Sequence, residues 1–259
     1  MRIAARYTSL IVVTLMLASC GGSGGGFNLM SLEEEWQLGN QLSQEVARQV
    51  HLNNDPATNA YIRSLGERIV AQTPMAQLPW QFHVVDDPAI NAFAIPGGHV
   101  YVNTGLINAT ANASELAGVM AHEISHGVSR HSTEQMSAQY GLSALASIVL
   151  GQNAGNMQQM AAQLIAGGAL ARFSRGAERE ADELGIQYMA KAGFNPRGMA
   201  TMFQKLMENE QRQPSSVEQF FSTHPLTTER VRDAEKRAAA MGAGGVTDEP
   251  EFQRIKSRV

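Results

Sequence analysis

The chain of 259 residues contains a single cysteine, Cys20, so it cannot form an intramolecular disulfide. It has no basic stripe, and its formal net charge of −4 gives no reason to expect a nucleic-acid partner. Residues 135–171 contain no charged side chain, yet Ser, Gln and Asn interrupt every apolar stretch in them. The run of roughly 20 apolar residues that a membrane-spanning helix needs is therefore missing. With 44% hydrophobic residues, the chain can still bury a sizeable core.

The first residues have the pattern of an export signal. Two arginines precede an apolar run from Leu10 to Ala18, which is too short for a typical membrane span. The residues Leu17-Ala-Ser-Cys20 resemble a bacterial lipobox, which implies cleavage before Cys20 and lipidation of that cysteine. An ordinary secretory signal with an incidental cysteine is the alternative interpretation.

We therefore expect a signal peptide over residues 1–19, followed by a lipidated Cys20 and a flexible Gly/Ser tether over residues 20–29. Several acyl chains anchor a protein stably, so the membrane is an expected partner through the N-terminal lipid. In lipoproteins of this type from Gram-negative bacteria, a residue other than Asp after the cysteine, here Gly21, implies the outer membrane. Assuming such a source, the expected location is the periplasmic face of that membrane.

Periodicity and capping signals predict a mostly helical chain with a small sheet. Helices are expected over about 31–50, 55–72, 114–131, 177–192, 196–211 and 227–241, and strands over 81–85, 91–95 and 99–103. Residues 135–171 are interpreted as a buried or half-buried helical hairpin with a break near Gly151 to Gly155. A lid, or a surface that touches a membrane, is the alternative for this hairpin. The expected domain spans residues 30–241, with residues 242–259 as a C-terminal tail.

The chemistry of the chain is most visible in Ala121-His-Glu-Ile-Ser-His126. On a helix, His122 and His126 lie one turn apart on the same face and can hold two positions around one zinc ion. Glu123 is adjacent to the first of them and can reach a zinc-bound water. This is the H-E-x-x-H arrangement of a metalloprotease. A surface helix with two solvated histidines is the alternative.

A third zinc ligand is expected in the segment from Ala177 to Gly185. There Glu178 and Asp182 are four residues apart and share one helix face. Glu178 would bind zinc, and Asp182 would accept a hydrogen bond from a ligand histidine, as carboxylates beside metal sites usually do. The alternative is an acidic face in contact with solvent, and the spacing alone does not decide between the two.

Four segments, in order, resemble the zinc metallopeptidase family of the CAAX prenyl endopeptidase, HtpX and BepA, and in form its small periplasmic lipoprotein members such as LoiP. They are Asn91-Ala-Phe-Ala-Ile-Pro-Gly-Gly-His-Val-Tyr-Val-Asn-Thr-Gly-Leu106, His122-Glu-Ile-Ser-His126 with Arg130-His131, Ser174-Arg175 with Glu178-Arg-Glu-Ala-Asp182, and Thr223-His-Pro225 with Arg230. The resemblance implies an α+β fold, a mostly helical zincin-like (gluzincin) metalloprotease domain with a small β-sheet beside the H-E-x-x-H helix.

The resemblance also implies roles for individual residues. Zinc, one ion per chain, is expected on His122, His126 and Glu178, with Glu123 as catalytic base and Asp182 in the active site. The family positions of His224 and Arg230 lie at the cleft, where they could stabilise the oxyanion. His224 could instead bind zinc and keep the enzyme off, or be an exposed histidine at a helix start.

An extended substrate is expected to add to the sheet edge near Ala94, Gly97 and Gly98, although a plain hairpin turn also explains the glycines. The predicted activity is a zinc metalloendopeptidase that acts on misfolded or envelope proteins in periplasmic quality control. A chaperone or assembly factor that uses the zinc cleft for client binding is the alternative, and a structural zinc protein is a weaker one. The remaining histidines are interpreted as structural or solvated: His51, His83, His99 and His131.

Overall fold

The computed structural model describes residues 27–150, 154–167, 170–242 and 244–259. The expected signal peptide, Cys20, Gly21 and most of the tether lie outside these residues, as do residues 151–153 of the expected hairpin break. None of the described helices combines the length and the apolarity that crossing a bilayer requires.

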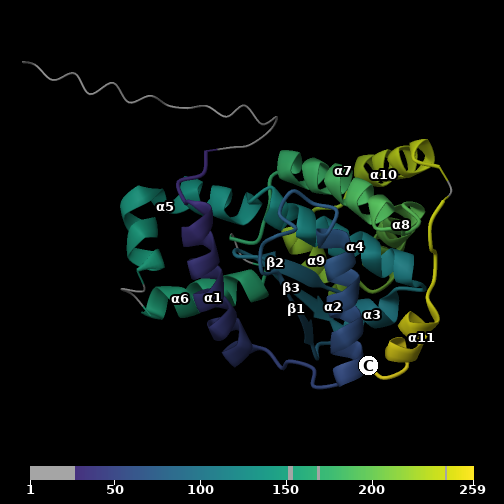
Figure 1. The fold of residues 1–259 in the computed structure, drawn as a ribbon, viewed down its shortest axis with the longest axis horizontal. Coiled ribbons are helices and arrows are strands. Elements are labelled where there is room, and N and C mark those ends of the chain that lie inside the picture. Colours follow the sequence, from purple (N-terminus) through teal and green to yellow (C-terminus); the bar gives the residue numbers. More distant parts are fainter. Residues whose placement is uncertain (1–26, 151–153, 168–169, 243) are drawn as a thin grey trace, which may run out of the picture.

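A three-stranded sheet lies at the centre of the molecule (Figure 1). The strands are β1 (Gln81–Val85), β2 (Ala92–Ile95) and β3 (His99–Asn103), in the spatial order β1-β3-β2. β3 pairs in parallel with β1 and antiparallel with β2, with Ala94 opposite Val100. Among the described strands, β2 is therefore an edge strand that pairs only with β3.

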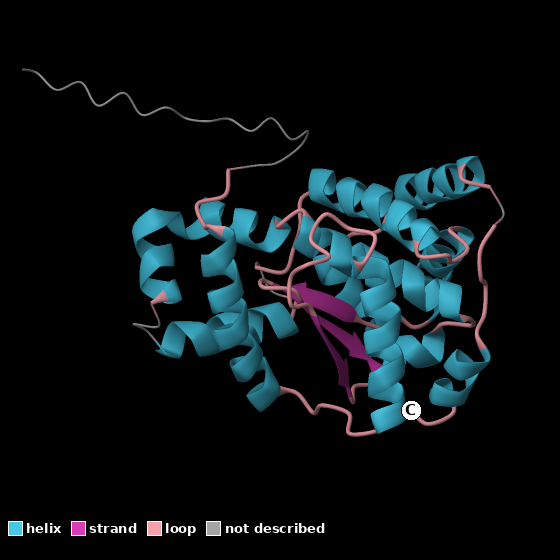
Figure 2. Ribbon diagram, in the orientation of Figure 1, coloured by secondary structure: helices cyan, strands magenta, loops and turns pink. Residues whose placement is uncertain are grey.

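Helices cover both faces of the sheet (Figure 2). They are α1 (Leu32–Gln49), α2 (Pro56–Val70), α3 (Thr104–Ala109), α4 (Ala113–Val128), α5 (His131–Val149), α6 (Ala154–Ile165), α7 (Arg175–Lys191), α8 (Arg197–Arg212), α9 (Pro214–Thr223), α10 (Thr228–Ala240) and α11 (Pro250–Lys256). The predicted α+β class, a mostly helical domain with a small sheet, is confirmed.

Alternation along β2 separates two hydrophobic cores. Ala92 and Ala94 face one core, which α2, α4, α7 and α8 help to form. Phe93 and Ile95 face the other core, which the sheet shares with α1, α5 and α6. Small side chains thus face α4 and large ones face the α1 side, so α4 can approach the sheet closely.

α4 also packs closely against α8. A Cβ atom built at Gly118 would lie 2.7 Å from the Cα atom and 2.9 Å from the backbone nitrogen of Met199. Only glycine therefore permits this helix crossing without a shift of the backbone. All residues of α4 from Ala113 to His126 are buried, which makes it the central helix of the domain.

The helix expected over 114–131 is two helices in the structure. α4 ends at Val128, and α5 begins at His131 after Arg130, whose φ of 58° is left-handed. This strained conformation is stabilised by side-chain contacts: Arg130 Nε lies 2.5 Å from Glu35 Oε2, and its Nη2 donates to the Met30 carbonyl at 2.7 Å. The turn brings His131 back beside the end of α4.

The residues expected to form a C-terminal tail pack against the domain from Val246 onwards. Val246 pairs with Phe194, and Phe252 is fully buried in the core that contains α2 and α4. Glu249 accepts hydrogen bonds from the Tyr61 hydroxyl at 2.9 Å and from Arg68 Nη1 at 2.6 Å. This segment therefore covers one side of α2.

Candidate metal centre

α4 carries His122, Glu123 and His126 into the interior of the molecule. All three side chains are fully buried, as expected of a helix that is covered on every side up to His126. Asn112 caps the start of the helix by accepting from the Glu115 backbone N–H at 3.0 Å. The sequence pattern and the buried helix together hold the two imidazoles one turn apart and facing the same way, with their Nε2 atoms 3.1 Å apart.

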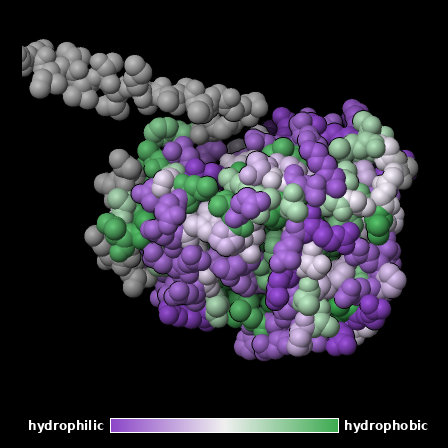
Figure 3. All heavy atoms as spheres, viewed as in Figure 1, coloured by the Kyte–Doolittle hydropathy of each residue, from purple (hydrophilic) through white to green (hydrophobic). Residues whose placement is uncertain are grey.

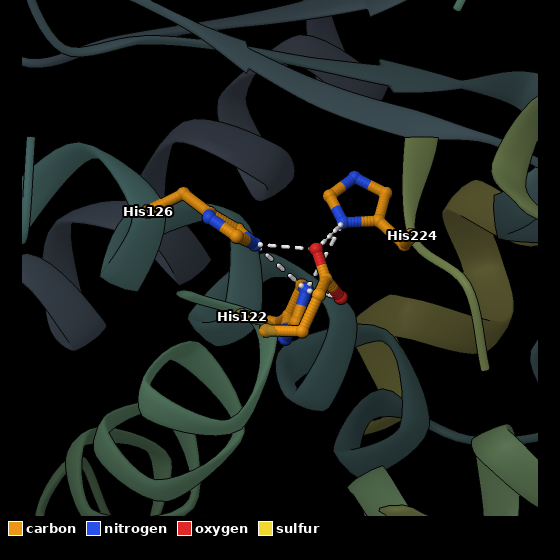
Figure 4. Close-up of side chains that lie close together, drawn as sticks. His122, His126 and His224 are labelled. Atoms are coloured by element: carbon orange, nitrogen blue, oxygen red, sulfur yellow. Dashed lines mark hydrogen bonds and ion pairs between the residues drawn. The ribbon is translucent and has the colours of Figure 1, made fainter. Parts of the chain in front are cut away.

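Two other segments complete a cluster of possible ligands. Glu178 comes from the first turn of α7, which Ser174 caps, and His224 follows the end of α9. Glu178 and His224 are each 1% exposed. The three imidazoles converge on one point, with His224 approaching from a segment separate from the helix of His122 and His126 (Figure 4).

The spacing of the donor atoms fits a zinc ion. His224 Nδ1 lies 3.0 Å from Glu178 Oε1 and 3.3 Å from His122 Nε2, and His126 Nε2 lies 3.4 Å from Glu178 Oε1. Ligand atoms about 2.0–2.1 Å from a tetrahedral zinc lie roughly 3.3–3.4 Å apart. The donors are imidazole nitrogens and a carboxylate oxygen, which zinc accepts readily.

Glu123 lies at the edge of this cluster. Its Oε2 accepts a hydrogen bond from the backbone N–H of Ala94 at 3.0 Å, which fixes the carboxylate against β2. Its Oε1 lies 3.3 Å from His224 Nε2 without the geometry of a hydrogen bond. Burial raises the pKa of this carboxyl group, so its affinity for a proton is increased.

Asp182 and Arg230 form an ion pair beside the cluster. Arg230 donates from Nε and Nη2 to the two carboxylate oxygens of Asp182, at 2.7 and 2.8 Å. Its Nη1 lies 2.6 Å from Glu178 Oε2 and donates to the Pro225 carbonyl at 2.9 Å. Asp182 Oδ1 in turn lies 3.0 Å from His122 Nδ1. Arg230 therefore orients two carboxylates and holds the backbone beside His224.

The charges around the cluster stabilise the ionised carboxylates. Burial alone would raise the pKa of Glu178, but the neighbouring His224, His122 and His126 outweigh it and hold that pKa well below its usual value. Burial likewise opposes ionisation of Asp182, yet Arg230 and His122 lower its pKa. Both carboxylates are thus in the form that binds cations.

His131, interpreted from the sequence as structural or solvated, contacts the cluster. Its Nδ1 lies 2.9 Å from His126 Nδ1, and its Nε2 lies 3.7 Å from Glu180 Oε2. Phe173, from the segment before α7, stacks on the His126 ring with the centroids 3.9 Å apart. The H-E-x-x-H spacing contains no signal for either residue, because both contacts depend on how the chain turns outside α4.

The residues expected at the sheet edge have different surroundings. Ala94 lies beside the cluster, and its N–H is bonded to Glu123. Gly97 and Gly98, both with positive φ, lie against α1: a Cβ at Gly97 would be 2.9 Å from Gly39 Cα, and one at Gly98 would be 3.0 Å from the Trp36 ring. The close packing of α1 on this hairpin therefore explains why glycine occupies both positions.

The model of peptidase family M48 matches residues 56–238. This range contains all the buried groups of the cluster together with Ala94, Asp182 and Arg230.

Individual relatives carry protease names. The beta-barrel assembly-enhancing protease of Yersinia pestis is 34% identical over 253 residues, which cover 94% of this chain and 51% of that protein. The protein of the same name from Escherichia coli K12 is 34% identical over 251 residues, covering 93% and 51%. The mitochondrial metalloendopeptidase OMA1 of Schizosaccharomyces pombe is 32% identical over 213 residues, covering 81% and 63%. The chain thus spans about half the length of the first two relatives.

Proposed function

The chain belongs to peptidase family M48, and from that premise we propose that it is a zinc metalloendopeptidase that hydrolyses peptide bonds of misfolded or envelope proteins. The observation that carries this proposal is the buried cluster of four possible ligand atoms, all within 4.8 Å of one another, with a carboxyl group of raised pKa beside it. Protein quality control at the periplasmic side of the outer membrane, with a lipid on Cys20, is the cellular role and location we propose.

We propose that His122, His126 and Glu178 hold one zinc ion. Bound there, zinc would lower the pKa of its water ligand to near 7 and would polarise the scissile carbonyl. Glu123 takes the proton from the attacking water and passes it to the leaving amine. Its hydrogen bond to Ala94 keeps the second oxygen in place, so only the first is available to the water.

Asp182 and Arg230 act as positioning residues in this proposal. Asp182 holds His122 through Nδ1, so that Nε2 is directed at the metal. Arg230 contacts Asp182, Glu178 and the Pro225 carbonyl with its three nitrogen atoms, and it is 5% exposed. Its charge therefore acts on the carboxylates of Glu178 and Asp182 in this conformation.

The position of His224 corresponds to a closed enzyme. Its Nδ1 stands at the fourth corner of the donor cluster, where water or a substrate carbonyl has to bind. We propose that His224 leaves this position when substrate enters. Its imidazole is then free to stabilise the oxyanion, which joins both roles expected from the sequence.

A pair of variants tests the proposed function. Glu123→Gln should retain one zinc per chain by elemental analysis and lose cleavage of an unfolded protein substrate. Glu178→Ala should lose zinc. Cleavage by Glu123→Gln at the wild-type rate would refute the mechanism, and unchanged zinc in Glu178→Ala would exclude Glu178 as a ligand. A chaperone that only binds clients would suppress aggregation equally well with Glu123 replaced.

A further inference from the structure

A cavity of about 310 Å³ adjoins the metal cluster at Glu178. It lies between the start of α7 and the segment that follows His224. Arginines line the α7 side: Arg172, Arg175 and Arg179. Because Glu178 also forms part of the wall, a group bound in this cavity lies next to the proposed metal ligands.

The arginines give this cavity an unbalanced positive charge. Arg172 and Arg175 are exposed and form no ion pair with any described residue. Within the described part of the chain, Arg179 has only the exposed Glu229 as an ion-pair partner, with its Nη2 3.3 Å from that carboxylate. Hydrophilic residues gather around α7 on the face shown in Figure 3. This local excess of positive charge is opposite in sign to the net charge of the whole chain, which is −4.

The acidic groups in the wall do not cancel that charge. Glu178 is in contact with Arg230, whose Nη1 lies 2.6 Å away, and with the imidazoles of the cluster. The positive end of the α7 dipole also points toward this region, because Arg175 is the first residue of that helix. Both effects favour an anion in the cavity.

We propose that this cavity is a substrate subsite for an acidic residue, Asp or Glu, within one or two positions of the scissile peptide bond. The inference rests on the proposed endopeptidase function and adds a substrate class to it. A guanidinium group binds a carboxylate through two parallel N–H donors, a geometry that amide or hydroxyl side chains of a substrate do not match. Arg172 and Arg175 are the residues that recognise it.

Cleavage-site mapping tests the proposal. Zinc-loaded wild-type protein digests an unfolded protein substrate, and mass spectrometry identifies the cut sites; acidic residues should be enriched at one position beside the cut. Two fluorogenic peptides that differ only by Glu or Gln at that position should then differ by up to roughly tenfold in kcat/KM, since two ion pairs with exposed arginines together contribute at about this level. The difference should shrink as salt is raised.

Variants separate recognition from catalysis. In Arg172→Gln/Arg175→Gln, the Glu/Gln ratio should fall to about one while the Gln peptide is cleaved at the wild-type rate. Arg63→Gln, which removes an exposed arginine of α2 outside the cavity, should keep the full ratio. Equal cleavage of both peptides by the wild-type protein, or an unchanged ratio in the double variant, would overturn the proposal.

A binding measurement tests the acidic-residue subsite separately from the proposed endopeptidase function. The matched peptides are titrated against zinc-loaded Glu123→Gln protein by fluorescence anisotropy. Tighter binding of the Glu peptide, abolished by the double arginine substitution, supports the subsite even if the wild-type protein cleaves nothing, which would refute only the endopeptidase function. Equal binding of both peptides refutes the subsite.

Discussion

Replacing His131 by Asn or by Leu separates the hydrogen bond to His126 from every other effect of this side chain. The two Nδ1 atoms lie 2.9 Å apart, and His126 and His131 are 0% and 5% exposed. When His126 binds zinc through Nε2, its proton must be on Nδ1, and His131 has to accept it. Asn carries a carbonyl oxygen close to the place of Nδ1, whereas Leu has the same shape without an acceptor.

The expected magnitude follows from that burial. In His131→Leu, zinc binding leaves the His126 Nδ1–H buried without a partner, at a cost of about 1–3 kcal/mol. This corresponds to a loss of roughly 5- to 150-fold in zinc affinity. The metal-free protein escapes the cost, because there the proton can move to Nε2, which faces His122 Nε2 at 3.1 Å. His131→Asn should stay within about threefold of wild type.

Zinc affinity is measured by equilibrium competition with a chromophoric chelator at neutral pH. Thermal unfolding of the metal-free proteins serves as the control for folding, and the two variants should unfold at similar temperatures. Nitrogen-15 NMR of the imidazoles should find the His126 proton on Nδ1 in the zinc-bound wild type and in His131→Asn. Equal zinc affinities of the Asn and Leu variants would refute the reasoning.

Three further predictions concern other parts of the structure. Because His224 is proposed both to occupy the fourth corner and to stabilise the oxyanion, His224→Ala should weaken zinc binding and slow cleavage by the zinc-loaded protein; faster cleavage would mean that His224 only blocks the site. Gly118→Ala should lower the free energy of unfolding by about 1–3 kcal/mol in urea titrations, since its Cβ would meet the Met199 backbone at 2.7 Å. Burial lowers the pKa of His83 and His99 to about 4, so the unfolded chain binds more protons below pH 6.5 and stability should fall from pH 6.5 toward pH 4. His83→Gln should reduce that pH dependence; an unchanged slope in urea titrations would contradict it.

The sequence predicted the parts of the site that depend on local spacing. The pairs His122 with His126 and Glu178 with Asp182 are each four residues apart on one helix, and the structure keeps each pair on one face. The long-range convergence of α4, α7 and the segment at His224 came from the family resemblance. Spacing alone gives no distance between residues on different helices.

What the sequence did not predict depends on tertiary contacts. The left-handed turn at Arg130 occurs at a residue other than glycine and relies on Glu35 and Met30, which are distant in the chain. α3 and α9 are short, so their apolar periodicity gives little signal. The packing of the C-terminal segment depends on Glu249 and Phe252 finding partners on and beside α2.

The hydrogen bonds of residues 28–30 also determine which part of the structure a mechanical load on the N-terminus would reach first. Asn28 donates to Thr133 at 2.8 Å, and the Leu29 N–H donates to Ser137 at 2.9 Å, while Arg130 holds the Met30 carbonyl. A pull on the N-terminal end of the described chain is therefore transmitted first to Arg130 and the first turns of α5, and only then to α1. The turn at Arg130 holds His131 beside His126, so tension at the N-terminus would act on the surroundings of the metal centre.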